Sequence, residues 1–232
     1  MIFDTVAEPI QPDGHKSKNV ARLAYIGLAG LCCFVVTVVP LHWIQPDLNP
    51  LNEAVSYYVH GAWGWLLTIG LLALGIGSLA VTAGVGRAVG GPGVRAGWWL
   101  LSIWSIGVLL AGIIPADPPG HWDKPPSLAG MIHGNAALVA ILTLPIAALV
   151  LARSFRHDPQ WHRKVTVLLV LAIATALSMG AFMASLVPVM VSPGPPWLLG
   201  LTERILLGVY VVWLWIVAVG LLQAAGRLRT AA

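Results

Sequence analysis

Six long apolar blocks occupy most of this chain, and they constrain its fold more than any other feature of the sequence. The blocks cover about residues 22–44, 62–84, 96–115, 128–151, 165–187 and 201–222, and each is nearly free of charged residues. A helix needs roughly 20 apolar residues to cross a bilayer core about 30 Å thick. The blocks lack the period-two alternation of barrel strands, and only helices or closed barrels satisfy the backbone in hydrocarbon. The sequence therefore predicts an all-α membrane protein with six transmembrane helices.

The composition supports the same fold class. Hydrophobic residues make up 58% of the 232 positions and charged residues only 9%, against about 25% charged in an average soluble domain. This deficit excludes a disordered chain, a soluble nucleic-acid-binding protein and an ordinary cytosolic enzyme. The net charge of +4 resides in short loops between apolar blocks, which is a signal of membrane topology and not of a nucleic-acid-binding patch.

Lysine and arginine predict the orientation. Eleven of the 13 fall on one side of the predicted membrane, and the other side keeps only Lys124 and Arg204. The eleven are Lys16, Lys18, Arg22, Arg87, Arg95, Arg153, Arg156, Arg163, Lys164, Arg227 and Arg229. The positive-inside rule places this side in the cytoplasm. We therefore expect cytoplasmic tails at residues 1–21 and 223–232, flanking a six-helix domain at residues 22–222.

The opposite, outer side carries an excess of acidic residues and histidines. Five of the nine acidic residues and four of the seven histidines lie there. They are Asp47, Glu53, Asp117, Asp123 and Glu203, with His42, His60, His121 and His133. Ionisable groups at the membrane edge are costly and usually face a cavity or one another. This distribution predicts a polar pocket at the outer leaflet.

The segment 45–61, which follows the first apolar block, contributes several of these polar residues. Prolines interrupt its first half, and from Leu51 onward it is expected to be helical. On that helix Asn52, Ser56 and His60 would form one polar stripe, since they are spaced by four. The stripe either faces solvent on an interfacial helix or lines the predicted pocket.

The turn between the third and fourth blocks carries a second group. Pro115 is expected to end the third helix and to hold Asp117 just beyond the lipid edge, and Ser127 is expected to cap the fourth helix. His133 then lies about two turns into the fourth block. A buried histidine there needs a partner, for which Asp117 or Ser56 is available. The histidine either makes a structural hydrogen bond or has a metal-binding or catalytic role.

Glu203 and Arg204 open the sixth block and complete the outer group. Arg204 is the only arginine on that side and lies at the lipid edge. Such an arginine either extends to the lipid headgroups or pairs with an acid, here Asp117, Glu203 or Glu53. It is also suited to an anionic ligand such as a lipid phosphate or carboxylate.

Four motifs in order along the chain resemble a bacterial membrane family catalogued as domain of unknown function 998. Its pattern has a serine before the second span, a Gly-x-x-Pro-x-Asp turn, a Gly-x-x-His motif and a Gly-Leu-x-x-Arg motif opening the last span. The matching positions are Ser56, Gly112, Pro115, Asp117, Gly130, His133, Gly200, Leu201 and Arg204. The resemblance implies a multi-pass protein of the bacterial cytoplasmic (inner) membrane. It implies no activity.

The first functional interpretation is a protein that binds a lipid or small ligand at the outer leaflet, or an accessory membrane subunit. The candidate ligand-binding residues are Ser56, His60, Asp117, His133, Glu203 and Arg204. Membrane lipids and other membrane subunits are the expected partners, and nucleic acid is not expected.

The second interpretation is a metal-dependent hydrolase acting on a lipid, with zinc as its cofactor. His60, Asp117, His121 and His133 could supply the three or four ligands that zinc needs. The arrangement is similar to the alkaline ceramidase and adiponectin-receptor superfamily, but the His-x-x-x-His pair expected there is missing. A bis-histidine haem held by His60 and His133 is a third interpretation. A transporter is disfavoured because no inverted repeat is visible.

Overall fold

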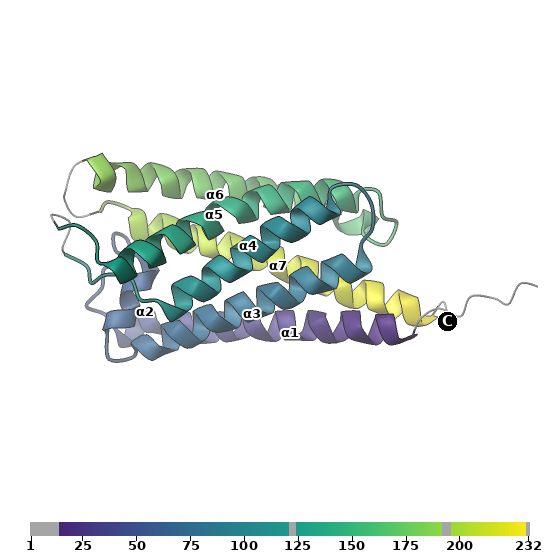
Figure 1. Ribbon diagram of the computed structural model, residues 1–232, viewed down its shortest axis with the longest axis horizontal. Coiled ribbons are helices and arrows are strands. Elements are labelled where there is room, and N and C mark those ends of the chain that lie inside the picture. Colours follow the sequence, from purple (N-terminus) through teal and green to yellow (C-terminus); the bar gives the residue numbers. More distant parts are fainter. Residues whose placement is uncertain (1–13, 121–123, 192–195, 231–232) are drawn as a thin grey trace, which may run out of the picture.

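The computed structural model describes residues 14–120, 124–191 and 196–230, and it confirms the all-α prediction. Six helices in this part of the chain are long and apolar enough to cross a membrane (Figure 1). Their bounds are α1 (Gly14–Val38), α3 (Gly64–Ala88), α4 (Val94–Ile113), α5 (Leu128–Phe155), α6 (Val165–Val191) and α7 (Leu199–Thr230). The chain is therefore a multi-pass membrane protein.

The helices extend past the apolar blocks that predict them. Helix α1 begins at Gly14, eight residues before the expected boundary at 22, and α7 continues to Thr230. A helix does not end where the lipid ends, and residues 15–22 and 222–230 contain no proline that would stop it. Three short elements complete the description, namely α2 (Leu41–Ile44) and the 3₁₀ helices η1 (Val55–His60) and η2 (His162–Lys164).

The six long helices form a closed bundle. Consecutive long helices pack against each other from α1 to α7, and α7 returns to pack against α1. The closure is fixed at one point by the Ser17 hydroxyl, which donates to the carbonyl oxygen of Ala225 at 2.8 Å. Helix α1 therefore begins at the end of the bundle where α7 finishes (Figure 1). We call this the termini end and the opposite one the distal end.

Close backbone contact between α1 and α3 depends on glycine. A Cβ atom on Gly30 would lie 2.8 Å from the Cα atom of Gly77 and would collide with the carbonyl oxygen of Ala73. Small residues at such positions let membrane helices approach closely and gain van der Waals contact. The pairing places the end of α1 and the start of α3 side by side at the distal end.

Two buried hydrogen bonds between side chains and neighbouring helices lie inside the bundle. Trp104 donates to the Ser78 hydroxyl at 3.1 Å, and the Tyr210 hydroxyl donates to the carbonyl oxygen of Ile141 at 2.7 Å. Each bond joins two helices, and each satisfies a polar group that would otherwise be unpaired in an apolar interior.

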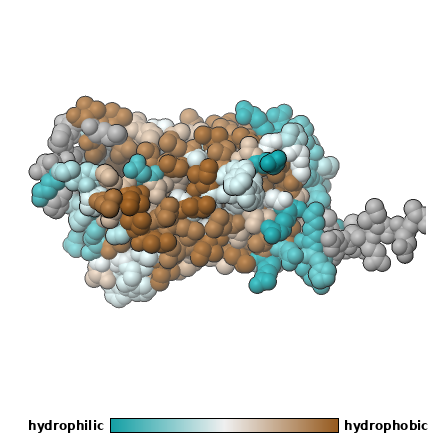
Figure 2. All heavy atoms as spheres, in the orientation of Figure 1, coloured by the Kyte–Doolittle hydropathy of each residue, from teal (hydrophilic) through white to brown (hydrophobic). Residues whose placement is uncertain are grey.

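Figure 2 shows the surface of the protein, where hydrophobic residues cover the middle of the visible face and hydrophilic residues gather toward the two ends.

Candidate ligand pocket at the distal end

The segment after α2 docks onto the start of α7. The backbone N–H of Leu201 donates to the carbonyl oxygen of Leu51 at 3.0 Å, and Leu198 N–H donates to the Asn52 side chain at 3.1 Å. The Val55 N–H donates to the Glu203 carboxylate at 2.7 Å. These bonds satisfy groups that a helix start and an irregular segment would otherwise leave unpaired. They fix residues 51–55 as one wall beside α7.

Gly200 allows this docking. A Cβ atom there would lie 2.7 Å from the carbonyl oxygen of Pro50 and would also collide with that of Glu53. The glycine of the Gly-Leu-x-x-Arg motif is thus explained by a close backbone approach. Its leucine supplies the N–H that reaches Leu51.

The predicted helix from Leu51 to His60 is wrong in extent. Only the 3₁₀ helix η1 forms. Asn52 accepts from Leu198 N–H, Nε2 of His60 lies beside the carbonyl oxygen of Ala116, and Ser56 lines a cavity. The Asn49 side chain accepts from Leu51 N–H at 2.9 Å, and the Glu53 carboxylate accepts from Asn49 N–H at 2.6 Å. These local bonds hold a turn where a helix was expected.

Arg204, which is partly buried, donates hydrogen bonds to four protein groups. Its Nε donates to Nε2 of His42 at 2.7 Å, one terminal nitrogen donates to the carbonyl oxygens of Glu53 and Gly200 at 2.8 and 2.9 Å, and the other donates to the Tyr58 hydroxyl at 3.3 Å. The guanidinium also lies 5.7 Å from the centre of the Tyr58 ring. Within the described residues it forms no ion pair with the predicted acids. Arg204 therefore joins α7 to the α2 corner and to η1.

Two histidines hold the turn that follows α4. Nδ1 of His133 lies 3.0 Å from the carbonyl oxygen of Ala111 and 2.8 Å from that of Ile114, and Nε2 of His60 lies 2.8 Å from that of Ala116. A carbonyl only accepts, so each of these ring nitrogens carries a proton. The partner of His133 is thus the free carbonyl end of α4, and not the side chain of Asp117 or Ser56.

Asp117 and Ser127 together cap α5. The Asp117 carboxylate accepts from the backbone N–H of Ser127 at 2.8 Å and from its hydroxyl, whose oxygen in turn accepts from Gly130 N–H at 3.0 Å. The predicted cap at Ser127 is confirmed. A negative charge is favourable at the positive end of a helix dipole. Gly130 leaves room for this carboxylate, because a Cβ atom there would lie 2.8 Å from Asp117 Oδ1.

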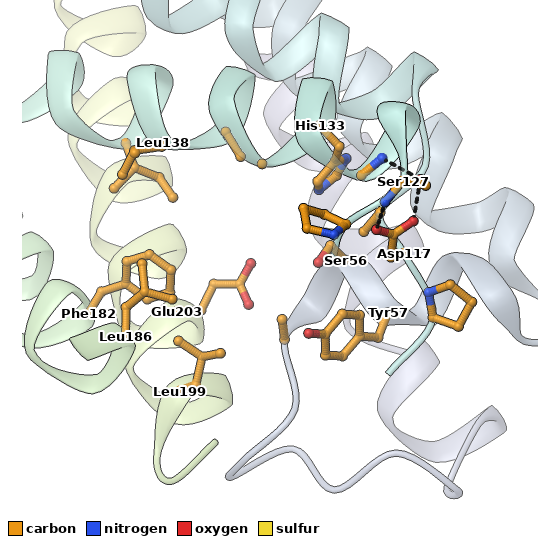
Figure 3. A pocket seen from close by; sticks show the side chains of 18 of the residues that line it. Ser56, Tyr57, Asp117, Ser127, His133, Leu138, Phe182, Leu186, Leu199 and Glu203 are labelled. Atoms are coloured by element: carbon orange, nitrogen blue, oxygen red, sulfur yellow. Dashed lines mark hydrogen bonds between the residues drawn. The ribbon is translucent and has the colours of Figure 1, made fainter. Parts of the chain in front are cut away.

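These anchors border a cavity of about 600 Å³ between α5, α6, α7 and residues 54–57 and 116–118. Its polar wall is shown in Figure 3, where the Glu203 carboxylate and the Tyr57 hydroxyl extend into the space between α7 and η1. The polar lining residues are Ser56, Tyr57, Asp117, Lys124, Ser127, His133 and Glu203. The main apolar ones are Leu138, Ile141, Phe182, Leu186 and Leu199. We call this cavity the distal pocket.

Several polar atoms of the distal pocket are not used by the fold. Among the described residues, no hydrogen-bond partner lies beside the Ser56 hydroxyl, Nε2 of His133 or the Oε1 oxygen of Glu203. Burial raises the pKa of the Tyr57 phenol above its ordinary value, and the carboxylates of Glu203, Glu53 and Asp117 raise it further. Tyr57 is therefore a neutral hydroxyl at physiological pH.

The structure brings together four of the six predicted ligand-binding residues. Ser56, Asp117, His133 and Glu203 line the distal pocket, whereas Arg204 and His60 are absent from its lining. Tyr57, Lys124 and the apolar side chains of α6 were missed. Nothing in the sequence separates Phe182 or Leu186 from the other apolar residues of their block.

The predicted metal ligands are not assembled in the described part of the chain. No three His, Cys, Asp or Glu side chains there are close enough to hold one ion. His60 and His133 each use one ring N–H to donate to backbone carbonyl oxygens, which leaves only the other ring nitrogen of each for a ligand. His121, the remaining candidate, lies outside the described residues.

A comparison with known families confirms the resemblance found in the motifs. The family model described as "Protein of unknown function (DUF998)" matches residues 28–222, which include all six membrane-spanning helices at least in part. No curated protein and no solved structure is significantly similar to the chain.

Proposed function

We propose that this chain, which belongs to the DUF998 family, binds an amphiphilic molecule, a lipid or a small lipid-like ligand, in the distal pocket. One observation carries the proposal. Polar atoms without protein partners lie on one wall of a cavity whose other wall is built from apolar residues of three membrane-spanning helices, α5, α6 and α7. A volume of about 600 Å³ falls within the range of small-molecule sites.

The polar wall favours a headgroup that donates hydrogen bonds. Glu203 Oε2 is already used by Val55 N–H, which leaves Oε1 to accept from a ligand. Nδ1 of His133 carries its proton toward α4, so in the neutral ring Nε2 is an acceptor. Two carboxylates, Glu203 and Asp117, outnumber the single cation Lys124 in the lining. A hydroxyl or amine headgroup therefore suits this wall better than a phosphate or carboxylate.

The apolar wall suits an acyl or isoprenoid chain. Leu138 and Ile141 of α5 face the same cavity as Phe182 and Leu186 of α6. Burial of apolar surface contributes about 25 cal/mol per Å², so a chain seated there would supply much of the affinity. Gly134 of α5 borders the pocket and is exposed on a membrane-spanning helix. We infer that the ligand enters from the bilayer beside Gly134.

The charge distribution supports placing the distal pocket at the outer leaflet of the cytoplasmic membrane. Eleven lysines and arginines belong to the termini end, which the positive-inside rule places in the cytoplasm. On this topology the ligand is a molecule of the outer leaflet. Other membrane subunits could then receive it from the same side.

The test blocks the pocket at Gly134 without touching its polar groups. The chain, purified in mild detergent, is analysed by native mass spectrometry and lipid extraction for bound amphiphiles. A Cβ atom on Gly134 meets no atom within 4 Å, so Gly134→Phe can place its ring in the cavity. We expect it to remove the bound molecule while the delipidated variant unfolds at the same temperature as the delipidated wild type.

The matched control is Gly180→Phe on α6, which is also exposed and also meets no atom within 4 Å but does not line the pocket. It should retain the bound molecule. Glu203→Gln keeps an oxygen for Val55 N–H and removes only the charge, so it should weaken binding by about tenfold while the loop stays docked. Equal amounts of amphiphile bound to wild type, Gly134→Phe and Glu203→Gln would overturn the proposal.

A further inference from the structure

We propose a second, independent site at the termini end, which binds the phosphate group of an anionic phospholipid from the leaflet on that side. It consists of a cavity of about 560 Å³ at the turn between α3 and α4, which we call the α3–α4 cavity. It stands apart from the distal pocket, shares no residue with it and does not depend on the function proposed for that pocket.

Two arginines supply the positive charge. Arg87 comes from the last turn of α3 and Arg95 from the first turn of α4, so the turn between the helices brings them to one cavity. Both side chains are exposed. Guanidinium groups match the geometry of phosphate oxygens and bind them with paired hydrogen bonds.

Most of their hydrogen-bonding capacity is not used by the fold. One terminal nitrogen of Arg87 donates to the carbonyl oxygen of Ala83 at 3.0 Å. Among the described residues, no acceptor contacts the other nitrogens of Arg87 or any nitrogen of Arg95. The residues that line the cavity include no acid, and the first turn of α4 carries none. The positive potential is therefore left for an outside anion.

The start of α4 adds to this potential. Its N-cap is Gly93, with φ of 83°, and no side chain caps the helix there. The N-terminus of a 20-residue helix carries partial positive charge and unpaired N–H groups, which favour an anion such as phosphate. Gly90 and Gly91 also line the cavity, and a Cβ atom on either of them would meet no atom within 4 Å. The helix start is therefore open on the side of Gly90 and Gly91, whereas Ser154 of α5 packs against Gly93.

Two tryptophans indicate a lipid source for the phosphate. Trp98 and Trp99 line the cavity with ring centres 4.7 Å apart, and Trp99 is 58% exposed. Trp98 packs against Gly86, where a Cβ atom would lie 2.9 Å from the indole. Tryptophan is enriched at the depth of the lipid headgroups, where the phosphates also lie. The cavity thus brings two arginines, the N-terminus of α4 and two tryptophans together at the expected depth of the lipid headgroups.

The experiment compares lipids that differ in headgroup charge. Delipidated protein in mild detergent is titrated with phosphatidylglycerol or phosphatidylcholine and followed by native mass spectrometry. Wild type should prefer phosphatidylglycerol. In the double variant Arg87→Gln/Arg95→Gln this preference should fall by roughly 25-fold, since each arginine near an anionic surface contributes about a factor of five. Unfolding temperatures should stay unchanged because both side chains are exposed.

The control variant is Arg156→Gln/Arg163→Gln, which removes two exposed arginines outside the α3–α4 cavity. It should keep the preference. Inorganic phosphate at millimolar concentration is a further arm: failure to displace phosphatidylglycerol supports a lipid source, and full displacement would overturn it in favour of a soluble phosphate. An undiminished preference in Arg87→Gln/Arg95→Gln, or an equal loss in the control, would refute the site.

Discussion

Arg204 Nε donates to Nε2 of His42 at 2.7 Å, and this bond fixes the tautomer of the histidine. A ring nitrogen that accepts a hydrogen bond carries no proton, so the proton of His42 lies on Nδ1, which is 3.0 Å from the carbonyl oxygen of Val39. A neutral histidine thus serves as an acceptor for an arginine at the edge of the membrane. The pair connects the second turn of α7 to α2, which follows the end of α1.

Replacing Arg204 by lysine should destabilise the protein even though the charge is kept. A lysine has one nitrogen and cannot reach His42, Glu53, Gly200 and Tyr58 together. The groups left unpaired should cost about 2 kcal/mol of unfolding free energy, which denaturation in mild detergent can measure. Arg163→Lys, at an exposed position, is the control and should have no effect. Equal stability of wild type and Arg204→Lys would show that the hydrogen bonds of the guanidinium group do not contribute to the stability.

Asp117 and Gly130 should show strong energetic coupling. Gly130→Ala places a methyl group against the Asp117 carboxylate, so it should destabilise the wild type. Asp117→Ala should cost about 1 kcal/mol through loss of the Ser127 contacts. In the double variant the collision is absent, so its loss should be smaller than the two single losses added. A double-mutant cycle measures this, and simple additivity would contradict the contact.

Tyr57 should make the stability of the distal loops sensitive to alkali. The pKa of its phenol is raised in the fold, first by burial and then by nearby carboxylates, whereas in the unfolded chain it is about 10. The folded protein therefore holds this proton more tightly, and the associated stability is complete below about pH 10 and lost as the pH rises further. Tyr57→Phe cannot ionise.

Unfolding temperatures are measured at pH values about one unit apart between pH 8 and pH 11. As the pH rises, they should fall more steeply for wild type than for Tyr57→Phe. Tyr25, which is exposed on α1, provides the control Tyr25→Phe. Its profile should follow that of the wild type. Parallel profiles for wild type and Tyr57→Phe would contradict the raised pKa.

Gly30→Ala should destabilise the contact between α1 and α3. Alanine favours a helix by up to about 1 kcal/mol over glycine, but here its methyl group would meet the backbone of α3. Overpacking of this kind costs about 1–3 kcal/mol, so the net change is a loss. Gly208→Ala on α7 meets no atom within 4 Å and should be neutral or stabilising. If both variants behave alike, the close approach at Gly30 is not tight.

The apolar blocks and proline positions were enough to predict the spans and the cap at Ser127, because both depend on local chemistry and lipid thickness. The helix expected from Leu51 did not form because its N–H groups and carbonyls bind α7, which begins almost 150 residues later. The partners of Arg204 could not be predicted for the same reason, because most of them lie far from it in the sequence. An arginine at the lipid edge suggested an acid, yet it binds His42 and backbone oxygens that only the folded chain brings near.

The distal pocket was predictable on one wall only. Ser56, Asp117, His133 and Glu203 stand out because polar groups are rare in such a chain. Phe182 and Leu186 do not, because every block is rich in similar residues and only the packing of α5 against α6 selects them.

The bond from Ser17 to Ala225 joins residues 208 positions apart, and it has a consequence for how the protein is made. Helix α1 leaves the ribosome before α7 and can bury its Ser17 hydroxyl only after α7 has been inserted. During synthesis α1 and α3 can pair early, through the glycines that face each other. The face of α1 that packs against α7 must meanwhile be covered by lipid or by the insertion machinery, so the ring of helices closes only once α7 has entered the membrane.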